Sequence, residues 1–397
     1  MIKGILFAFL LALAMLDAPA QSSRKLHNKA VVIDTHNDIL TTAADDGVLI
    51  DGNLKGKTHA DLQRFKEGGV DVQIFSVWCD GSYGTNTAFA RANREIDTLY
   101  AVIARNPDKM MLVTSPSELK KAVKQKKLGA MIGVEGGHMI EERLDYLDSL
   151  YNRGTRYLTL TWNNSTPWAT SAMFESRTDS AADKTRKKGL TDFGKQVVRR
   201  MNELGMIVDV SHVGEQTFWD AINTTTKPVI ASHSCAHALC PVYRNLKDDQ
   251  IRAIAKNGGV IHLNFYSGFI DSSFMKRVRE FNQRHRAERD SLRKINPEPH
   301  FAEGKLFEKY PDEVKGLRPP LSALLDHLDY IVKLAGVDHV GLGSDFDGIT
   351  SAPQQLDDVT AFPIITEELR KRGYSKRDVR KILGLNFIRV FEANSKK

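Results

Sequence analysis

The chain has 397 residues and a formal net charge of +7, with 42% hydrophobic and 26% charged residues. This balance is typical of a globular protein, and the length suits one large α/β barrel or two average domains. It excludes a largely disordered chain. The basic residues also lack the interleaved aromatics of a nucleic-acid-binding surface, so we expect no nucleic-acid partner.

Residues 1–20 have the layout of a secretory signal peptide. A basic start precedes an apolar run from Ile5 to Leu16, and small alanine residues before Gln21 offer a cleavage site. The run is too short to span a bilayer comfortably, and an uncleaved anchor is the alternative. No later segment is apolar enough to be a transmembrane helix. We therefore expect an exported protein, periplasmic or extracellular, with residues 21–397 forming a single domain.

Short β-rich runs recur along the rest of the chain, most of them followed by a polar turn and a helical pattern. Several are continuously apolar, which is typical of parallel strands buried on both faces. The predicted strands are residues 30–34, 70–77, 129–134, 156–161, 206–210, 228–231, 259–264 and 339–343. This alternation predicts a (β/α)₈ TIM barrel. A doubly wound open sheet is the runner-up, although no G-x-G-x-x-G motif opens a helix for a dinucleotide.

Amphipathic stretches of helical length lie between these strands. Thr191 is the expected N-cap of one of them. The predicted helices are residues 117–126, 141–153, 191–204, 216–223, 248–256, 321–335, 363–372 and 376–394. A charged segment, residues 267–320, interrupts the alternation of strands and helices between the seventh and eighth predicted strands. Because long loops usually have a function or are disordered, we expect an insertion over the mouth of the barrel, acting as a lid or an oligomer contact.

Histidines and carboxylates follow several predicted strands at their carboxyl ends, which is where barrel enzymes place their active sites. These residues are His36, Asp38, Glu135, His212, His233 and Asp345. Any one of them alone is more often an ordinary loop or core residue, but chance would rarely place the whole set at one rim. Nitrogen and oxygen ligands suit zinc, and also manganese or cobalt.

The set predicts a hydrolytic centre with two metal ions. Glu135 is the candidate bridge, because a carboxylate has two oxygens and because this residue is central in the order of ligands. Two neighbouring ions would hold a hydroxide between them and polarise a carbonyl group. Asp345 would then pass a proton from that water to the leaving amine.

Several short motifs occur in a fixed order along residues 31–392. They are Ile33-Asp-Thr-His-Asn-Asp38, Glu135-Gly-Gly-His138, Arg156-Tyr-Leu-Thr-Leu-Thr161, Thr166-Pro-Trp-Ala169, Ser232-His-Ser234, Arg244-Asn245, Asn264-Phe-Tyr266 and Ser344-Asp-Phe-Asp-Gly348. In this set the chain resembles the membrane (renal-type) dipeptidases, a branch of the metal-dependent amidohydrolases. The resemblance implies cleavage of dipeptides, including those with a C-terminal D-residue, and a homodimer.

The resemblance also implies which residues hold the metals. His36 and Asp38 would bind one zinc ion. His212 and His233 would bind the second, and Glu135 would bridge the two. The expected cofactor is therefore two zinc ions per chain.

Further roles follow from the same resemblance. Asp345 matches the family's general acid/base, Arg244 matches an arginine that binds the free carboxylate of the dipeptide, and Tyr266 would line the pocket. One position departs from the family. A histidine that touches the substrate carbonyl is here Trp162, followed by Asn163. The polarising donor is missing, moved to Asn163 or replaced by the indole N–H, and losing such a donor typically costs about a hundred- to a thousandfold in rate.

The leading hypothesis is thus a zinc-dependent dipeptidase that acts on small peptides. One alternative is a related amidohydrolase acting on N-acyl amino acids or lactones, which Arg244 does not exclude. Another is a metal-binding barrel that has lost catalysis, for which the change to Trp162 is the only support.

Overall fold

The computed structural model describes residues 21–177, 187–296 and 299–396, and the expected signal peptide lies outside them. The sheet is parallel throughout, and its strands follow the order β1-β2-β4-β5-β6-β7-β8-β9, with β3 pairing only with β4. A parallel bridge between Asn37 and Phe346 links β1 to the segment after β9. The predicted TIM barrel is therefore confirmed.

Each predicted strand corresponds to an observed one, with shifted ends. The strands are β1 Ile33–Asn37, β2 Val72–Trp78, β3 Met110–Leu112, β4 Leu128–Glu135, β5 Thr155–Thr159, β6 Ile207–Asp209, β7 Ile230–Ala231, β8 Val260–Leu263 and β9 Val340–Leu342. The short β3 was not predicted. Its pairing with the first residues of β4 is a tertiary contact, which local periodicity does not report.

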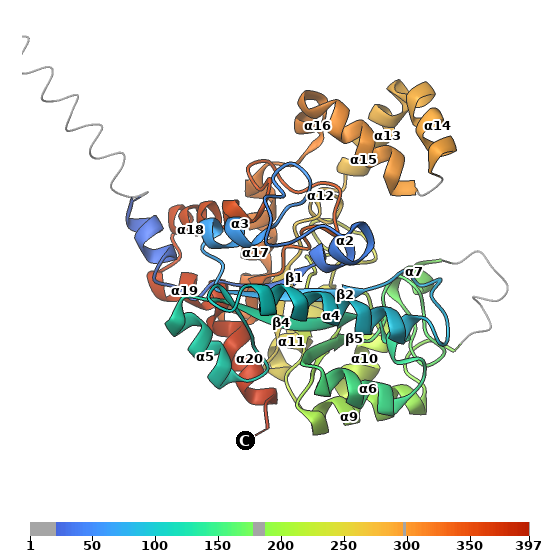
Figure 1. Ribbon diagram of the computed structural model, residues 1–397, viewed down its shortest axis with the longest axis vertical. Coiled ribbons are helices and arrows are strands. Elements are labelled where there is room, and N and C mark those ends of the chain that lie inside the picture. The colour runs from blue at the N-terminus through green and yellow to red at the C-terminus, as the bar shows by residue number, and fades with distance from the viewer. Residues whose placement is uncertain (1–20, 178–186, 297–298, 397) are drawn as a thin grey trace, which may run out of the picture.

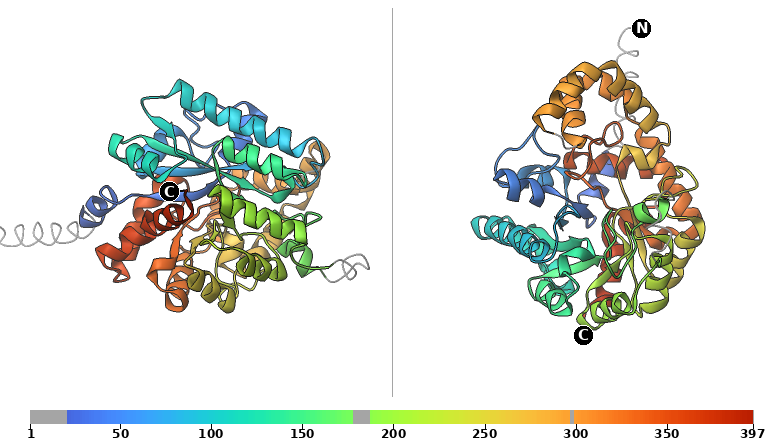
Figure 2. Two further views of the ribbon diagram at one scale, coloured as in Figure 1. Left: turned by 90° about the horizontal axis from the view of Figure 1, so that it is seen from below. Right: turned by 90° about the vertical axis from the view of Figure 1, so that its right-hand side faces the viewer.

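Helices surround the barrel, as the views in Figures 1 and 2 show. The longer ones are α2 Ile39–Asp46, α3 Leu62–Gly68, α4 Ala88–Arg105, α5 Pro116–Gln125, α6 Leu144–Asn152, α9 Asp192–Leu204, α10 Glu215–Thr224, α11 Asp248–Asn257, α17 Leu321–Ala335, α18 Phe362–Lys371 and α20 Asn386–Asn394. Short elements are α7 Ala172–Ser176, α19 Lys376–Arg380, the 3₁₀ turns Gly137–Ile140, Val337–His339 and Val359–Ala361, and the π turn Lys381–Leu385. The Thr191 side chain accepts a hydrogen bond from the Gly194 N–H, which confirms the predicted N-cap.

The interior of the barrel is a packed apolar core rather than a pore. Strand residues of this core include Ile33, Ile74, Met131 and Tyr157, and α20 adds Phe387, Val390 and Phe391. A separate and larger core lies between the strands and the surrounding helices. Because the interior is filled with side chains, a small molecule has to approach at an end of the barrel.

The insertion between β8 and β9 folds into helices. They are α12 Ser267–Ile270, α13 Phe274–Arg284, α14 Arg286–Ile295, α15 Pro299–Lys309 and α16 Pro311–Leu317. Together α13–α16 stand apart from the barrel in Figure 1 and at the end remote from the C-terminus in Figure 2. They have their own small core, which includes Phe274, Phe281 and Leu306.

Two features concern the cysteines and the helices of the described chain. Cys79, Cys235 and Cys240 are all buried free thiols, so no disulfide holds the fold together. Within the described ranges, none of the helices combines the length and apolar character needed to cross a membrane.

Candidate metal centre

The predicted ligands meet at the carboxyl ends of β1, β4, β6 and β7. The Glu135 carboxylate lies at the centre of the group. Its Oε1 is 2.8 Å from His212 Nε2 and 3.3 Å from His233 Nε2. Its other oxygen, Oε2, is 3.5 Å from His36 Nε2, which in turn lies 3.4 Å from Asp38 Oδ2. The two oxygens of Glu135 thus face two different pairs of ligands, and all of these residues are buried.

His36 reaches this cluster because β1 is irregular. Ile33 points into the barrel core, so a regular strand would also point Thr35 inward and His36 outward. The pairing register of β1 with β2 shifts between Asp34 and Asn37. The His36 imidazole consequently lies inside, with its Nδ1 2.8 Å from the Tyr157 hydroxyl.

The other two histidines are held in the same way, by a hydrogen bond at Nδ1. His212 Nδ1 lies 3.1 Å from Asn163 Oδ1, and His233 Nδ1 lies 2.8 Å from Ser232 Oγ. Ser232 Oγ donates to Asp209 Oδ2 at 2.6 Å, so His233 is linked through a hydroxyl to a buried carboxylate. Such contacts fix the ring orientation and tautomer and leave Nε2 available to a metal.

The donor set fits divalent cations. His36 Nε2 and Asp38 Oδ1 are buried and have no hydrogen-bond partner among the described residues. The Nε2 atoms of His212 and His233 lie only 3.0 Å apart. Burial lowers the pKa of His212 to about 4 and that of His233 well below its usual value, so both rings are neutral near pH 7. Neutral imidazoles and carboxylates are the forms that bind metal ions.

Asp345 follows β9 at the edge of this cluster. Its Oδ1 lies 4.0 Å from His36 Nε2, and its Oδ2 accepts a hydrogen bond of 2.8 Å from Asn264 Nδ2. Burial raises the pKa of Asp345 well above its usual value, and the nearby Asp38 and Glu135 carboxylates add to this rise. The structure therefore places Asp345 with the predicted ligands, and one of its oxygens faces them.

Two residues of the cluster have a strained backbone. His212 and Asp345 adopt positive φ angles of 64° and 61°. For non-glycine residues this conformation costs on the order of 1–3 kcal/mol and persists only where the surrounding structure holds it. The Asp345 N–H donates to the His36 carbonyl at 3.1 Å, so part of the constraint comes from the neighbouring strand, β1.

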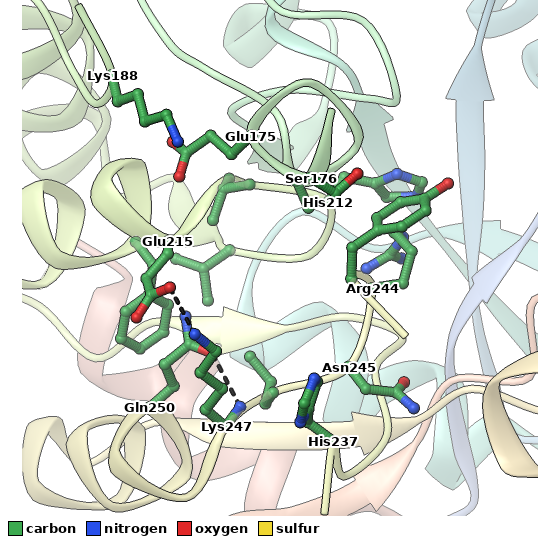
Figure 3. Close-up of a pocket in the computed structure, with 16 residues that line it drawn as sticks. Glu175, Ser176, Lys188, His212, Glu215, His237, Arg244, Asn245, Lys247 and Gln250 are labelled. Carbon is green, nitrogen blue, oxygen red and sulfur yellow. Dashed lines mark hydrogen bonds and ion pairs between the residues drawn. The ribbon is translucent and has the colours of Figure 1, made fainter. Parts of the chain in front are cut away.

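Arg244 is a buried cation without an acidic partner in the described part of the chain. Only 4% of it is exposed, and its one hydrogen bond runs from Nη2 to the His233 carbonyl at 3.2 Å. Its Nε is buried and unpartnered within the same ranges, and burial lowers the pKa of the guanidinium. Arg244 and His212 line a cavity of about 250 Å³, where Figure 3 shows them side by side. A buried guanidinium in this setting requires an anion.

The remaining predicted substrate residues lie around the cluster. Tyr266 packs its ring 4.9 Å from that of Phe269, and its hydroxyl lies 3.7 Å from Met275 Sδ, so it joins the rim to the insertion. Asn163 uses its Oδ1 to hold His212. The half-buried Trp162 ring lies 6.5 Å from the His212 ring.

Sequence reasoning missed Tyr157, Ser232, Asp209 and Asn264 as groups that orient the site. One signal was present for Asp209, because it interrupts the apolar strand that begins at Ile207. A carboxylate buried in such a strand needs hydrogen-bond donors, and the structure supplies them. Tyr157 and Asn264 have no such signal, because their partners His36 and Asp345 lie far away in the sequence, and Ser232 joins its neighbour His233 to the distant Asp209.

Comparisons with known proteins agree with this geometry. The family model of the membrane dipeptidases (peptidase family M19) matches residues 20–397. Dipeptidase 3 of Mus musculus is 32% identical over 365 residues, which cover 91% of this chain and 64% of the mouse protein. The chain thus spans less than two thirds of that relative.

Solved structures share the fold. Dipeptidase AC, a metallopeptidase of family M19, is 25% identical with a TM-score of 0.75, covering 92% of this chain and 98% of its own. A metallopeptidase from Rhodobacter sphaeroides, liganded with a phosphinate mimic of L-Ala-D-Ala, is 24% identical with a TM-score of 0.74, covering 92% and 99%. The chain therefore belongs to the membrane dipeptidase family, peptidase family M19, which is a family of metallopeptidases.

Proposed function

We propose that this chain is a zinc-dependent dipeptidase with two zinc ions per chain. The observation that supports this most directly is the placement of Glu135. One of its oxygens lies 2.8 Å from His212 Nε2 and the other 3.5 Å from His36 Nε2, which is how a carboxylate bridges two ions. When bound, two zinc ions lower the pKa of water and polarise a carbonyl oxygen, as peptide hydrolysis requires.

The ligands divide into two sets around Glu135. His36 and Asp38 would hold one ion, and His212 and His233 would hold the other. Nitrogen and oxygen donors of this kind are typical of catalytic zinc sites. The Nδ1 atoms of the three histidines are hydrogen-bonded to groups outside the cluster, which keeps the Nε2 atoms in place without the ions. The protein therefore has to reorganise little when it binds the ions.

Arg244 supports a substrate with a free carboxylate. Its guanidinium is buried beside His212 and lacks a counter-ion in the described ranges, and a carboxylate matches its planar fork. In a dipeptide bound there by its carboxylate, only the C-terminal residue lies between Arg244 and the peptide bond. Because the carboxylate is the anchor, we expect dipeptides with a C-terminal L- or D-residue to bind.

Asp345 carries the proton in this proposal. Asn264 holds its Oδ2, and its Oδ1 faces the ligand cluster. A carboxyl group at this position can accept a proton from the attacking water and donate it to the leaving amine.

We also propose that the protein is exported and works as a homodimer. Export rests on the signal-like residues 1–20, and the dimer rests on the family resemblance. Fractionation of cells and light scattering of the purified protein test these two points separately from the activity.

The main experiment compares hydrolysis of L,L and L,D dipeptides by the apo protein, the zinc-loaded protein and the Asp345→Asn variant. We expect zinc-dependent turnover that falls by about a hundred- to ten-thousandfold in the variant, with two zinc ions still bound. Asp347→Asn is the matched control. Asp347 is the neighbouring carboxylate two residues along the chain, and it accepts a hydrogen bond from the His59 N–H. Turnover of N-acyl amino acids or lactones alone, or none at all with both ions bound, would contradict the proposal.

A further inference from the structure

Two tryptophans stand side by side next to the ligand cluster. Trp78 ends β2 and pairs in register with Glu135, so both side chains leave the sheet on the same face. Trp162 follows β5, and its ring lies 6.5 Å from that of His212. The two indole rings are 5.0 Å apart with an interplanar angle of 69°. The metal centre described above makes no use of Trp78.

The local structure holds this pair in place. Edge-to-face contact is a favoured arrangement of two aromatic rings. The loops that carry the rings are also packed tightly, because a Cβ built on Gly81, after β2, would lie 2.5 Å from Asn164 Cβ, after β5. A Cβ on Gly136 would likewise lie 2.4 Å from the His138 ring and 3.4 Å from Trp162 Cβ. The two indoles therefore form a preorganised wall.

The wall is half-buried and mostly apolar. Trp162 makes ring contacts but no hydrogen bond with any residue that the structure describes. Trp78 Nε1 is buried and has no hydrogen-bond partner in the same part of the chain. Half-exposed aromatic rings are typical of the lining of a binding site.

Trp78 and Arg244 lie on opposite sides of the barrel, and Trp162 lies between them, next to His212. In the strand order, β2 and β7 are separated by β4, β5 and β6 on one side and by β1, β9 and β8 on the other. Arg244 follows β7, and the Glu135 bridge lies between. A dipeptide that places its carboxylate at Arg244 and its peptide bond at Glu135 therefore directs its N-terminal residue toward Trp78 and Trp162.

We infer that Trp78 and Trp162 form a subsite for the side chain of the substrate's N-terminal residue and select large apolar and aromatic side chains. This inference rests on the proposed dipeptidase function. An aromatic side chain gains both apolar burial and ring contacts against such a wall, whereas an alanine side chain is too short to reach across it.

The test compares kcat/KM for Phe-Ala and Ala-Ala. We expect the wild-type protein to prefer Phe-Ala by about tenfold or more, within the range that apolar pockets achieve. Trp162→Ala and Trp78→Ala should each reduce this preference to about threefold or less, chiefly through the Phe-Ala reaction. Trp162→Phe, which keeps an aromatic face, should retain most of it. A preference in both alanine variants within about twofold of wild type would overturn the inference.

Two controls separate the subsite from other effects. Trp219→Phe, on α10 in the outer layer, should leave the preference unchanged. The zinc content of each variant shows whether the neighbouring His212 has been disturbed. If the zinc-loaded wild type cleaves no dipeptide, the proposed function fails. The subsite is then tested by measuring the affinities of phosphinate mimics of Phe-Ala and Ala-Ala by calorimetry. Equal affinities for the two mimics would overturn the inference.

Discussion

Asn163 Oδ1 lies 3.1 Å from His212 Nδ1 and accepts a hydrogen bond from it. The residue directly after Trp162 therefore orients a metal ligand through its amide oxygen. This contact does not use the Asn163 Nδ2 group, which is the only part of the side chain that can donate to a substrate carbonyl.

Replacing Asn163 should weaken metal binding. We expect Asn163→Ala to lower zinc affinity by about 10- to 100-fold, because His212 loses the contact that fixes its ring. Asn163→Asp keeps an acceptor and should bind zinc nearly as well as wild type. Asn164→Ala is the adjacent control, since Asn164 Oδ1 has no hydrogen-bond partner among the described residues. A large loss of kcat with unchanged zinc affinity would instead make Asn163 a substrate contact.

Ser232→Ala should affect both zinc affinity and stability. It removes the acceptor of His233 Nδ1 and a donor to Asp209 Oδ2, which lie 2.8 and 2.6 Å from Ser232 Oγ. Groups left unsatisfied in a buried site typically cost about 1–3 kcal/mol of unfolding free energy. Thr159→Val is the matched control, because Thr159 donates to the same carboxylate oxygen at 2.5 Å but does not contact His233. Urea unfolding and zinc titration should distinguish the two variants. Both should lower the free energy of unfolding, but only Ser232→Ala should lower zinc affinity.

Arg244→Met should discriminate between substrates with and without a carboxylate. We expect kcat/KM for a dipeptide to fall by about a hundredfold or more, since a charged hydrogen-bonded partner is worth several kcal/mol. Hydrolysis of the corresponding dipeptide amide, which has no carboxylate, should change little. Since the buried guanidinium lacks an acidic partner in the described ranges, its loss should not lower the melting temperature. Equal losses for both substrates would place Arg244 in a structural role.

Asp71 should make stability depend on pH. Burial raises the pKa of its carboxyl from 3.8 to about 6, while the Val32 N–H opposes this rise. The folded state then keeps a proton that the unfolded state releases, so the stabilising effect of protonation is present below about pH 4 and is lost as the pH rises to about 6. Asp71→Asn removes this term. The variant should gain up to about 3 kcal/mol on wild type between pH 4 and 7 by urea unfolding. A difference that does not vary with pH would show that Asp71 has its ordinary pKa when folded.

The barrel was predictable because its signals are local. Apolar runs buried on both faces mark parallel strands, and helical spacing of leucines marked α17. The helix α4 is not among the predicted helices, although its buried Ala92, Ile96 and Leu99 have the same kind of spacing. The insertion was placed correctly, but its fold into α13–α16 depends on a small core that joins residues from both of its ends.

The sequence by itself determined which segments meet at the rim of the barrel. A parallel barrel brings the carboxyl ends of its strands to one rim, so the segments that carry His36, Glu135, His212, His233 and Asp345 converge there. Only the tertiary structure decided how they are held. The register shift that turns His36 inward, the Tyr157, Asn163 and Ser232 contacts, and the Trp78–Trp162 pair all depend on packing between segments distant in sequence, which local periodicity does not encode.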